Sequence, residues 1–149
     1  MGADVGRPVV VIAEDEADIA GMVAETLAAD VGVETVVVSN GALVVDAVIA
    51  AGASLLILDI NMPGATGIDV YDVVRNQEAL AHIPVLFLTA NPELAADALP
   101  GRAPREVMAK PFDIECLVLK VKELLAIASE RGPRDDVAVR VGLGEELRS

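Results

Sequence analysis

Short apolar runs that alternate with segments of helical periodicity constrain this chain more than any other feature of its sequence. The runs are rich in β-branched residues and cover residues 9–12, 33–38, 55–58 and 85–88, with a weaker fifth at 106–109. Their nearly continuous apolar character is typical of strands that are covered on both faces, as in a parallel sheet. We therefore expect buried parallel strands rather than half-exposed antiparallel ones.

The segments between these runs have apolar residues spaced three or four positions apart, which is the period of an amphipathic helix. The predicted helical stripes fall at residues 19–27, 44–51, 68–74, 92–99 and 114–125. Asn40 is a predicted N-cap of the second helix and Asp113 opens the last, while Gly32 and Gly52 end the first two. The pattern indicates five successive βα units.

Strict alternation of strands and helices with short connections predicts an α/β fold, a doubly wound five-stranded parallel sheet with helices on both faces. A chain of 149 residues is long enough to bury one substantial core. In sheets of this kind, ligands bind beyond the carboxyl ends of the strands. The residues at those ends are therefore the first candidates for a functional site.

The composition narrows the classes of partner. The chain is 54% apolar but only 2% aromatic, which disfavours ligands that need aromatic walls. It carries 24 Asp and Glu against 11 Lys and Arg, a formal charge of −13, which disfavours direct nucleic-acid binding because phosphates would be repelled. We expect the partners to be proteins.

The targeting and redox features point to the cytoplasm. Cys116 is the single cysteine and cannot form an internal disulfide, and no signal peptide is recognised. The most apolar window, residues 42–58, is interrupted by Asp46, Gly52 and Ser54, so no membrane insertion is expected. The periodic pattern fades after residue 128, which predicts a domain at 1–128 and a C-terminal tail or linker stub at 129–149.

Side chains that can bind a metal ion or a phosphate group lie at the ends of the predicted strands. Glu14 and Asp15 follow the first run, Asp59 the third, Thr89 the fourth and Lys110 the fifth. Crowded carboxylates raise one another's pKa or recruit a cation, and an all-oxygen site that must also leave room for phosphate oxygens suits Mg²⁺. An aspartate beside a metal and a lysine is a known nucleophile for phosphoryl transfer. Taken alone, Asp59 could equally be a turn-capping acid.

These motifs together resemble the receiver domains of two-component response regulators, over roughly residues 7–128. The resemblance is carried by EDE at 14–16, DINMPGATG at 59–67, LTA at 88–90 and AKPF at 109–112. It implies a flavodoxin-like (βα)5 fold with strand order 2-1-3-4-5. It also implies that Asp59 is a phosphoacceptor, charged by a sensor histidine kinase, a phosphotransfer protein or a small phosphodonor.

The resemblance assigns further roles to the strand-end residues. Asp59 and Asp15 would bind Mg²⁺ directly, Glu14 through water, and Asn61 through its main-chain carbonyl. Thr89 and Lys110 would bind the phosphoryl oxygens, and the Lys110-Pro111 bond is expected to be cis.

Two departures from the family pattern affect the expected output. Val107 stands three residues before Lys110, where receivers usually carry Tyr or Phe, so the ring half of the usual switch is missing. No DNA-binding or enzymatic module is recognised after the domain, which suggests a stand-alone receiver that signals to a downstream protein partner. Homodimerisation stays open.

Two rival functions remain. An aspartyl-nucleophile phosphatase usually needs a second acid two residues after the first, and here that residue is Asn61, so the general acid is missing. A receiver-like scaffold that binds partners without phosphorylation is favoured by Val107 and disfavoured by the intact set of acids, Thr89 and Lys110. We expect a signalling phosphoacceptor rather than an enzyme.

Overall fold

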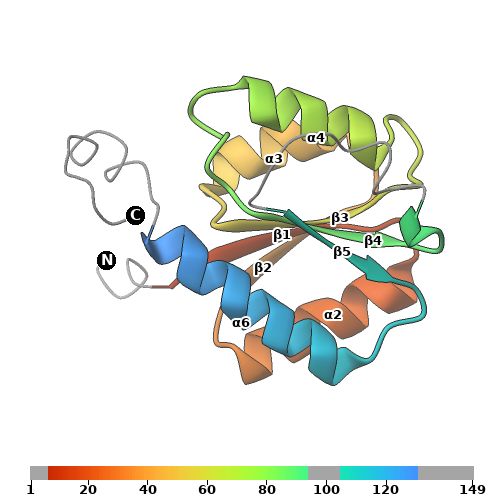
Figure 1. Cartoon of the computed structure of the whole chain (residues 1–149), viewed down its shortest axis with the longest axis vertical. Coiled ribbons are helices and arrows are strands. Elements are labelled where there is room, and N and C mark those ends of the chain that lie inside the picture. Colours follow the sequence, from red (N-terminus) through yellow and green to blue (C-terminus); the bar gives the residue numbers. More distant parts are fainter. Residues whose placement is uncertain (1–6, 94–104, 131–149) are drawn as a thin grey trace.

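The computed structural model describes residues 7–93 and 105–130, which form a five-stranded parallel sheet in the order β2-β1-β3-β4-β5 (Figure 1). The α/β fold class and the strand order predicted above are both confirmed. Each observed strand lies within one residue of its predicted bounds. The strands are β1 Val9–Ala13, β2 Glu34–Val38, β3 Leu55–Asp59, β4 Val85–Thr89 and β5 Arg105–Ala109.

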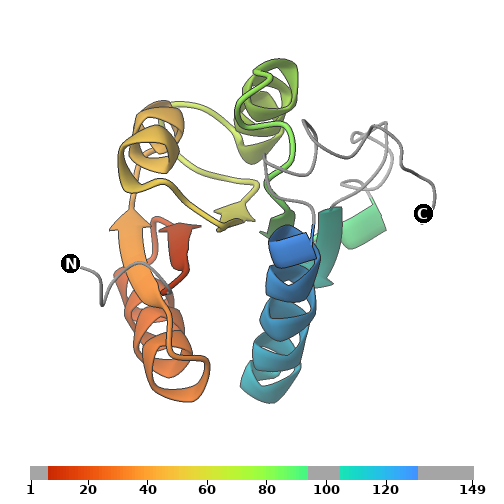
Figure 2. The ribbon, with the colours of Figure 1, turned by 90° about the vertical axis from the view of Figure 1, so that its left-hand side faces the viewer.

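Helices cover both faces of the sheet. The elements are α2 Ala17–Asp30, the short 3-10 helix η1 Gly41–Leu43, α3 Val44–Ala51, α4 Gly67–Asn76 and α6 Ile114–Glu130. Helices α3 and α4 lie on one face and α2 and α6 on the other (Figures 1 and 2). Each pair encloses its own aliphatic core against the sheet, with Phe87 on the α3–α4 side and Leu88 on the α2–α6 side.

Local sequence signals account for several helix ends. Gly52 follows α3 with a φ of 63°, a left-handed conformation that glycine adopts without strain. Thr66 Oγ1 accepts the Asp69 N–H at 3.1 Å and caps α4, and Asp113 Oδ1 accepts the Glu115 N–H at 2.8 Å. Asn40 was predicted to cap α3, but its side chain instead caps η1, which precedes that helix.

Burial differs between the central and edge strands. Every residue of β3 and β4 is buried, as continuous apolar runs predict. The expectation of two covered faces is wrong for β2, where Val37 is 46% exposed. This strand lies at the sheet edge beside β1 alone, so its apolar run is covered less completely.

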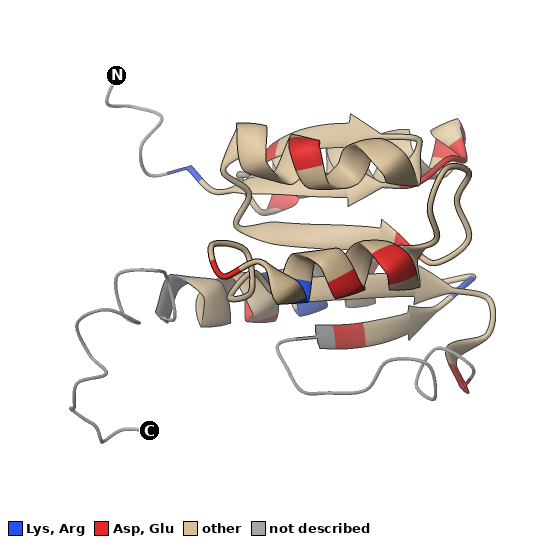
Figure 3. Ribbon diagram, turned by 90° about the horizontal axis from the view of Figure 1, so that it is seen from above, with Lys and Arg blue, Asp and Glu red and all other residues tan. Residues whose placement is uncertain are grey.

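Several expectations concern residues beyond the described ranges. Of the predicted helix at 92–99, only Pro92 and Glu93 are described, and both are helical. The predicted tail at 129–149 begins with two residues that continue α6, and residues 131–149 lie outside the described ranges. Within the described ranges, no helix combines the length and apolar character needed to cross a membrane. Acidic residues are spread over several described helices and far outnumber the Lys and Arg residues in the same view (Figure 3).

Candidate functional site

All five predicted strand-end residues lie at the carboxyl edge of the sheet, and four of them come together in one polar cluster. Glu14 directly follows β1, Asp59 is the last residue of β3, and Lys110 directly follows β5. Oxygen atoms of Glu14, Asp15 and Asp59 all lie within 4.8 Å of one another. The convergence arises because parallel strands end at the same edge, although these residues are far apart in the sequence.

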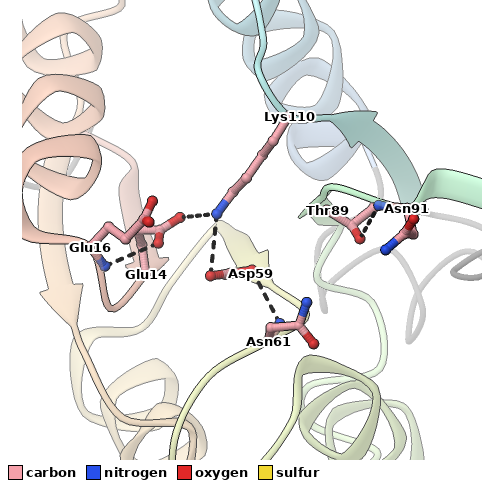
Figure 4. Close-up of polar contacts among 7 residues, drawn as sticks. All are labelled: Glu14, Glu16, Asp59, Asn61, Thr89, Asn91 and Lys110. Carbon is pink, nitrogen blue, oxygen red and sulfur yellow. Dashed lines mark hydrogen bonds and ion pairs between the residues drawn. The ribbon is translucent and has the colours of Figure 1, made fainter.

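Lys110 reaches across this edge and lies between two buried carboxylates (Figure 4). Its Nζ atom is 3.0 Å from Glu14 Oε1 and 3.3 Å from Asp59 Oδ2. The side chain of Glu14 is 0% exposed and that of Asp59 is 6% exposed, against 19% for Lys110. With the exposed Asp15 added, the cluster holds three carboxylates and one ammonium group.

For both Glu14 and Lys110, burial and the contacts between opposite charges shift the pKa in opposite directions. Burial raises the pKa of Glu14, and the contacts of this carboxylate with Lys110 and the Glu16 N–H only partly offset that rise. Burial acts to lower the pKa of Lys110, but its contacts with Glu14 and Asp59 outweigh burial, so the pKa of the ammonium group is raised. Lys110 therefore stays protonated beside the acids.

The donor set fits a hard divalent cation. Glu14 Oε2 accepts the Glu16 N–H at 3.1 Å, whereas the buried Glu14 Oε1 has Lys110 Nζ 3.0 Å away and receives no hydrogen bond of regular geometry within the described residues. Three carboxylates facing one ammonium group leave negative charge uncompensated, and Mg²⁺ prefers oxygen ligands of this kind. Asp15, Asp59 and Glu14 are the residues that could hold such an ion.

The loop after β3 keeps its backbone close to Asp59. The Asn61 N–H donates to Asp59 Oδ1 at 3.1 Å, and the Gly67 N–H donates to Ile60 O at 2.8 Å. A Cβ at position 67 would lie 2.7 Å from the main-chain oxygen of Asp59, so glycine allows the loop to close at its base. The main chain of Asn61 is thereby brought beside the carboxylate cluster.

Thr89 ends β4 at the same edge, but its hydroxyl is engaged elsewhere. Its Oγ1 atom accepts the Asn91 N–H at 3.0 Å, and Figure 4 draws no contact between Thr89 and either Asp59 or Lys110. The sequence places the residue correctly at the strand end, yet the rotation of its side chain depends on the following turn. The direct polar cluster therefore comprises Glu14, Asp59 and Lys110.

Two further expectations concern β5. The Lys110-Pro111 peptide bond is cis, as expected. Val107 pairs with Phe87 in the β4–β5 register and packs, partly buried, against the core on the α3–α4 side. An aliphatic side chain thus lies where the resemblance leads one to expect an aromatic ring.

A family comparison agrees with this geometry. The family model of the response regulator receiver domain matches residues 10–122, which include the five strands apart from Val9 and the whole carboxylate cluster with Lys110. The chain belongs to the response regulator receiver domain family. Receiver domains are signalling phosphoacceptors that bind Mg²⁺ in an acidic pocket and interact with sensor histidine kinases and downstream partners.

Two signalling proteins are similar to this chain over part of their length. The chain is 40% identical to the chemotaxis protein CheY of Pseudomonas aeruginosa over 72 residues, 46% of this chain and 56% of CheY. It is 30% identical to the sensor histidine kinase TmoS of Ectopseudomonas mendocina over 122 residues, 81% of this chain and 12% of TmoS. The chain thus covers about half of one relative and a small part of the other.

Solved receiver structures have the same fold. The response regulator TrrA of Thermotoga maritima, solved in complex with Mg²⁺–BeF, superposes with a TM-score of 0.67 at 27% identity. The superposition covers 78% of this chain and 98% of TrrA. The Mg²⁺ and BeF belong to the TrrA complex.

Proposed function

We propose that this receiver accepts a phosphoryl group on Asp59 in the presence of Mg²⁺ and signals through contacts with other proteins. The observation that supports the proposal most is the position of the Asp59 carboxylate. It is buried at the carboxyl edge, 3.3 Å from Lys110 Nζ and within 4.8 Å of oxygens from two other acids. A chain with an isolated turn acid would need neither the second and third carboxylates nor the lysine.

The transfer step follows from this arrangement. A carboxylate oxygen of Asp59 attacks phosphorus and forms an O–P bond, while the bond from phosphorus to the donor breaks and its electron pair leaves with the donor. With a phosphohistidine donor, the leaving group is the imidazole nitrogen of a histidine kinase or phosphotransfer protein. The Lys110 ammonium group is placed to neutralise charge on the phosphoryl oxygens.

The remaining residues would divide two tasks. Asp15, Asp59 and the main-chain carbonyl of Asn61 would bind Mg²⁺, with Glu14 acting through water. Thr89 would donate its hydroxyl proton to a phosphoryl oxygen, which is compatible with the Asn91 N–H occupying a lone pair of that hydroxyl. Later attack of water on phosphorus would break the Asp59 O–P bond and return the carboxylate.

The experiment treats the full chain with acetyl phosphate and Mg²⁺ and follows its intact mass. We expect one labile phosphoryl group on the parent chain and none on Asp59→Asn, because the amide is a poor nucleophile. Asp46→Asn removes an exposed acid from α3 and is the matched control, which should be modified like the parent.

Other outcomes would support the rival functions. An unmodified parent mass would contradict the proposal and favour a scaffold that works without phosphorylation. Sustained hydrolysis of a generic phosphate monoester, limited only by the amount of substrate, would favour the aspartyl phosphatase.

A further inference from the structure

A second loop holds the tip of the loop that carries Asn61. The Gly41 N–H, at the start of η1, donates to Pro63 O at 2.8 Å. Gly41 is buried, and a Cβ at this position would overlap the carbonyl oxygen of Ala65 and lie 2.8 Å from its carbon. The two backbones can approach this closely only because residue 41 has no side chain.

The contact is reciprocal at Gly64. This residue has a φ of 91°, and a Cβ there would overlap Asn40 Oδ1 and lie 2.8 Å from Asn40 Cγ. The Asn40 amide is itself held in place because its Oδ1 accepts the Ala42 N–H at 2.8 Å. Each loop thus contributes a glycine whose α-carbon packs on the other loop. We call these five residues the loop latch: Asn40, Gly41, Pro63, Gly64 and Ala65.

The part of the loop latch that lies in the Asn61 loop begins at Pro63, two residues after Asn61. The Asn61 N–H donates to Asp59 Oδ1 at 3.1 Å. The base of the same loop is closed by the hydrogen bond from the Gly67 N–H to Ile60 O at 2.8 Å. With both base and tip held, the main chain between them has little freedom to move relative to the carboxylates. None of the latch residues belongs to the carboxylate cluster, so any influence on that cluster passes through the loop.

We infer that the loop latch positions the main chain of Asn61 and thereby sets the affinity of the carboxylate cluster for a divalent cation. The inference rests on the proposed function, because it takes the Asn61 carbonyl as a ligand of Mg²⁺. Groups that orient metal ligands commonly change metal affinity by 10-fold or more when they are removed. Asn40 and Gly41 are positioning residues in this account and do not contact the reacting atoms.

The test measures the Mg²⁺ dissociation constant of the full chain by titration calorimetry, without a phosphodonor. Asn40→Ala removes the surface on which Gly64 packs, and Gly41→Ala forces the two backbones apart. Each variant is expected to raise the Mg²⁺ dissociation constant about 10-fold. Gly21→Ala is the matched control, because a Cβ at this exposed position on α2 meets nothing within 4 Å and should leave the constant unchanged.

A third variant separates the latch from helix capping. Serine caps a helix about as well as asparagine, but its shorter side chain cannot support Gly64. Asn40→Ser is therefore expected to unfold near the parent's denaturant midpoint while binding Mg²⁺ as weakly as Asn40→Ala. Parent-like Mg²⁺ affinity in Asn40→Ser, or in folded Asn40→Ala, would overturn the inference, and it would do so even if Gly41→Ala failed to fold.

A second readout distinguishes positioning from general damage. The rate of phosphoryl incorporation from acetyl phosphate should need about 10-fold more Mg²⁺ in the latch variants but reach the parent's maximum at saturation. If the latch variants incorporated phosphoryl groups as slowly at saturating Mg²⁺ as at limiting Mg²⁺, relative to the parent, the inference would be overturned while the proposed function stayed intact. A parent chain that neither binds Mg²⁺ nor incorporates phosphoryl would overturn both.

Discussion

Two lysines of this receiver each lie between two carboxylates, yet their surroundings differ. Lys110 lies 3.0 Å from Glu14 and 3.3 Å from Asp59, while Lys120 on α6 lies 3.0 Å from Glu123 and 3.6 Å from Glu106. The acids beside Lys110 are 0% and 6% exposed, whereas those beside Lys120 are 67% and 45% exposed.

The difference lies in the surroundings of the charges rather than in their number. Water solvates the carboxylates beside Lys120, so that ion pair contributes little to stability. The sheet edge removes most water from Glu14 and Asp59, so each charge there depends on Lys110 or on an added cation. The same combination of side chains is therefore a surface ion pair in one place and a candidate reaction site in the other.

The largest expected effect comes from replacing the lysine of the buried group. Lys110→Met leaves the carboxylates of Glu14 and Asp59 without their cation and should lower the free energy of unfolding by about 3 kcal/mol at neutral pH. Urea denaturation with a chelator present measures this loss. A change below about 0.5 kcal/mol, the size expected for exposed pairs, would remove the energetic distinction between the two groups.

The next expected effect is the pH dependence of that loss. Burial raises the pKa of Glu14, so the folded chain loses stability as pH rises through the raised pKa and Glu14 ionises. Lys110 limits this cost, and Lys110→Met should raise the pKa of Glu14 further. The stability difference between parent and variant should therefore shrink as pH falls from above the raised pKa toward the ordinary glutamate value. Parallel pH profiles for parent and variant would contradict this account.

Mg²⁺ should stabilise the folded chain through the carboxylates around Lys110 and not through those around Lys120. At a concentration ten times its dissociation constant, bound Mg²⁺ should raise the free energy of unfolding by about 1.4 kcal/mol. Asp15→Asn should abolish most of that gain, while Glu123→Gln at the exposed group should retain it. Denaturation with Mg²⁺ and with chelator makes the comparison, and an equal gain in both variants would place the ion elsewhere.

The smallest expected effect is that of the exposed lysine. Lys120→Met should change the free energy of unfolding by less than about 0.5 kcal/mol, and added salt should reduce even this difference. The same urea denaturation series measures it. A loss comparable with that of Lys110→Met would show that burial does not separate the two groups.

The sequence predicts the buried group well because the fold rule involved is simple. Parallel strands end at one edge, so locating three strands, β1, β3 and β5, was enough to bring Glu14, Asp59 and Lys110 together. The rotation of Thr89 toward the Asn91 N–H was not predictable, because it depends on a single side-chain torsion. The contact between Asn40 and Gly64 was also missed, since no periodic pattern links two loops on different βα units.

The position of the modified residue tests the central claim most directly. The full chain is phosphorylated with acetyl phosphate and Mg²⁺, reduced with borohydride, digested, and sequenced by mass spectrometry. Borohydride converts an aspartyl phosphate to homoserine, so this account predicts homoserine at position 59 and at no other acid. Homoserine at Asp15, reduction of Glu106 or Glu123 beside Lys120 to 2-amino-5-hydroxypentanoic acid, or no reduced residue in the chain would contradict it.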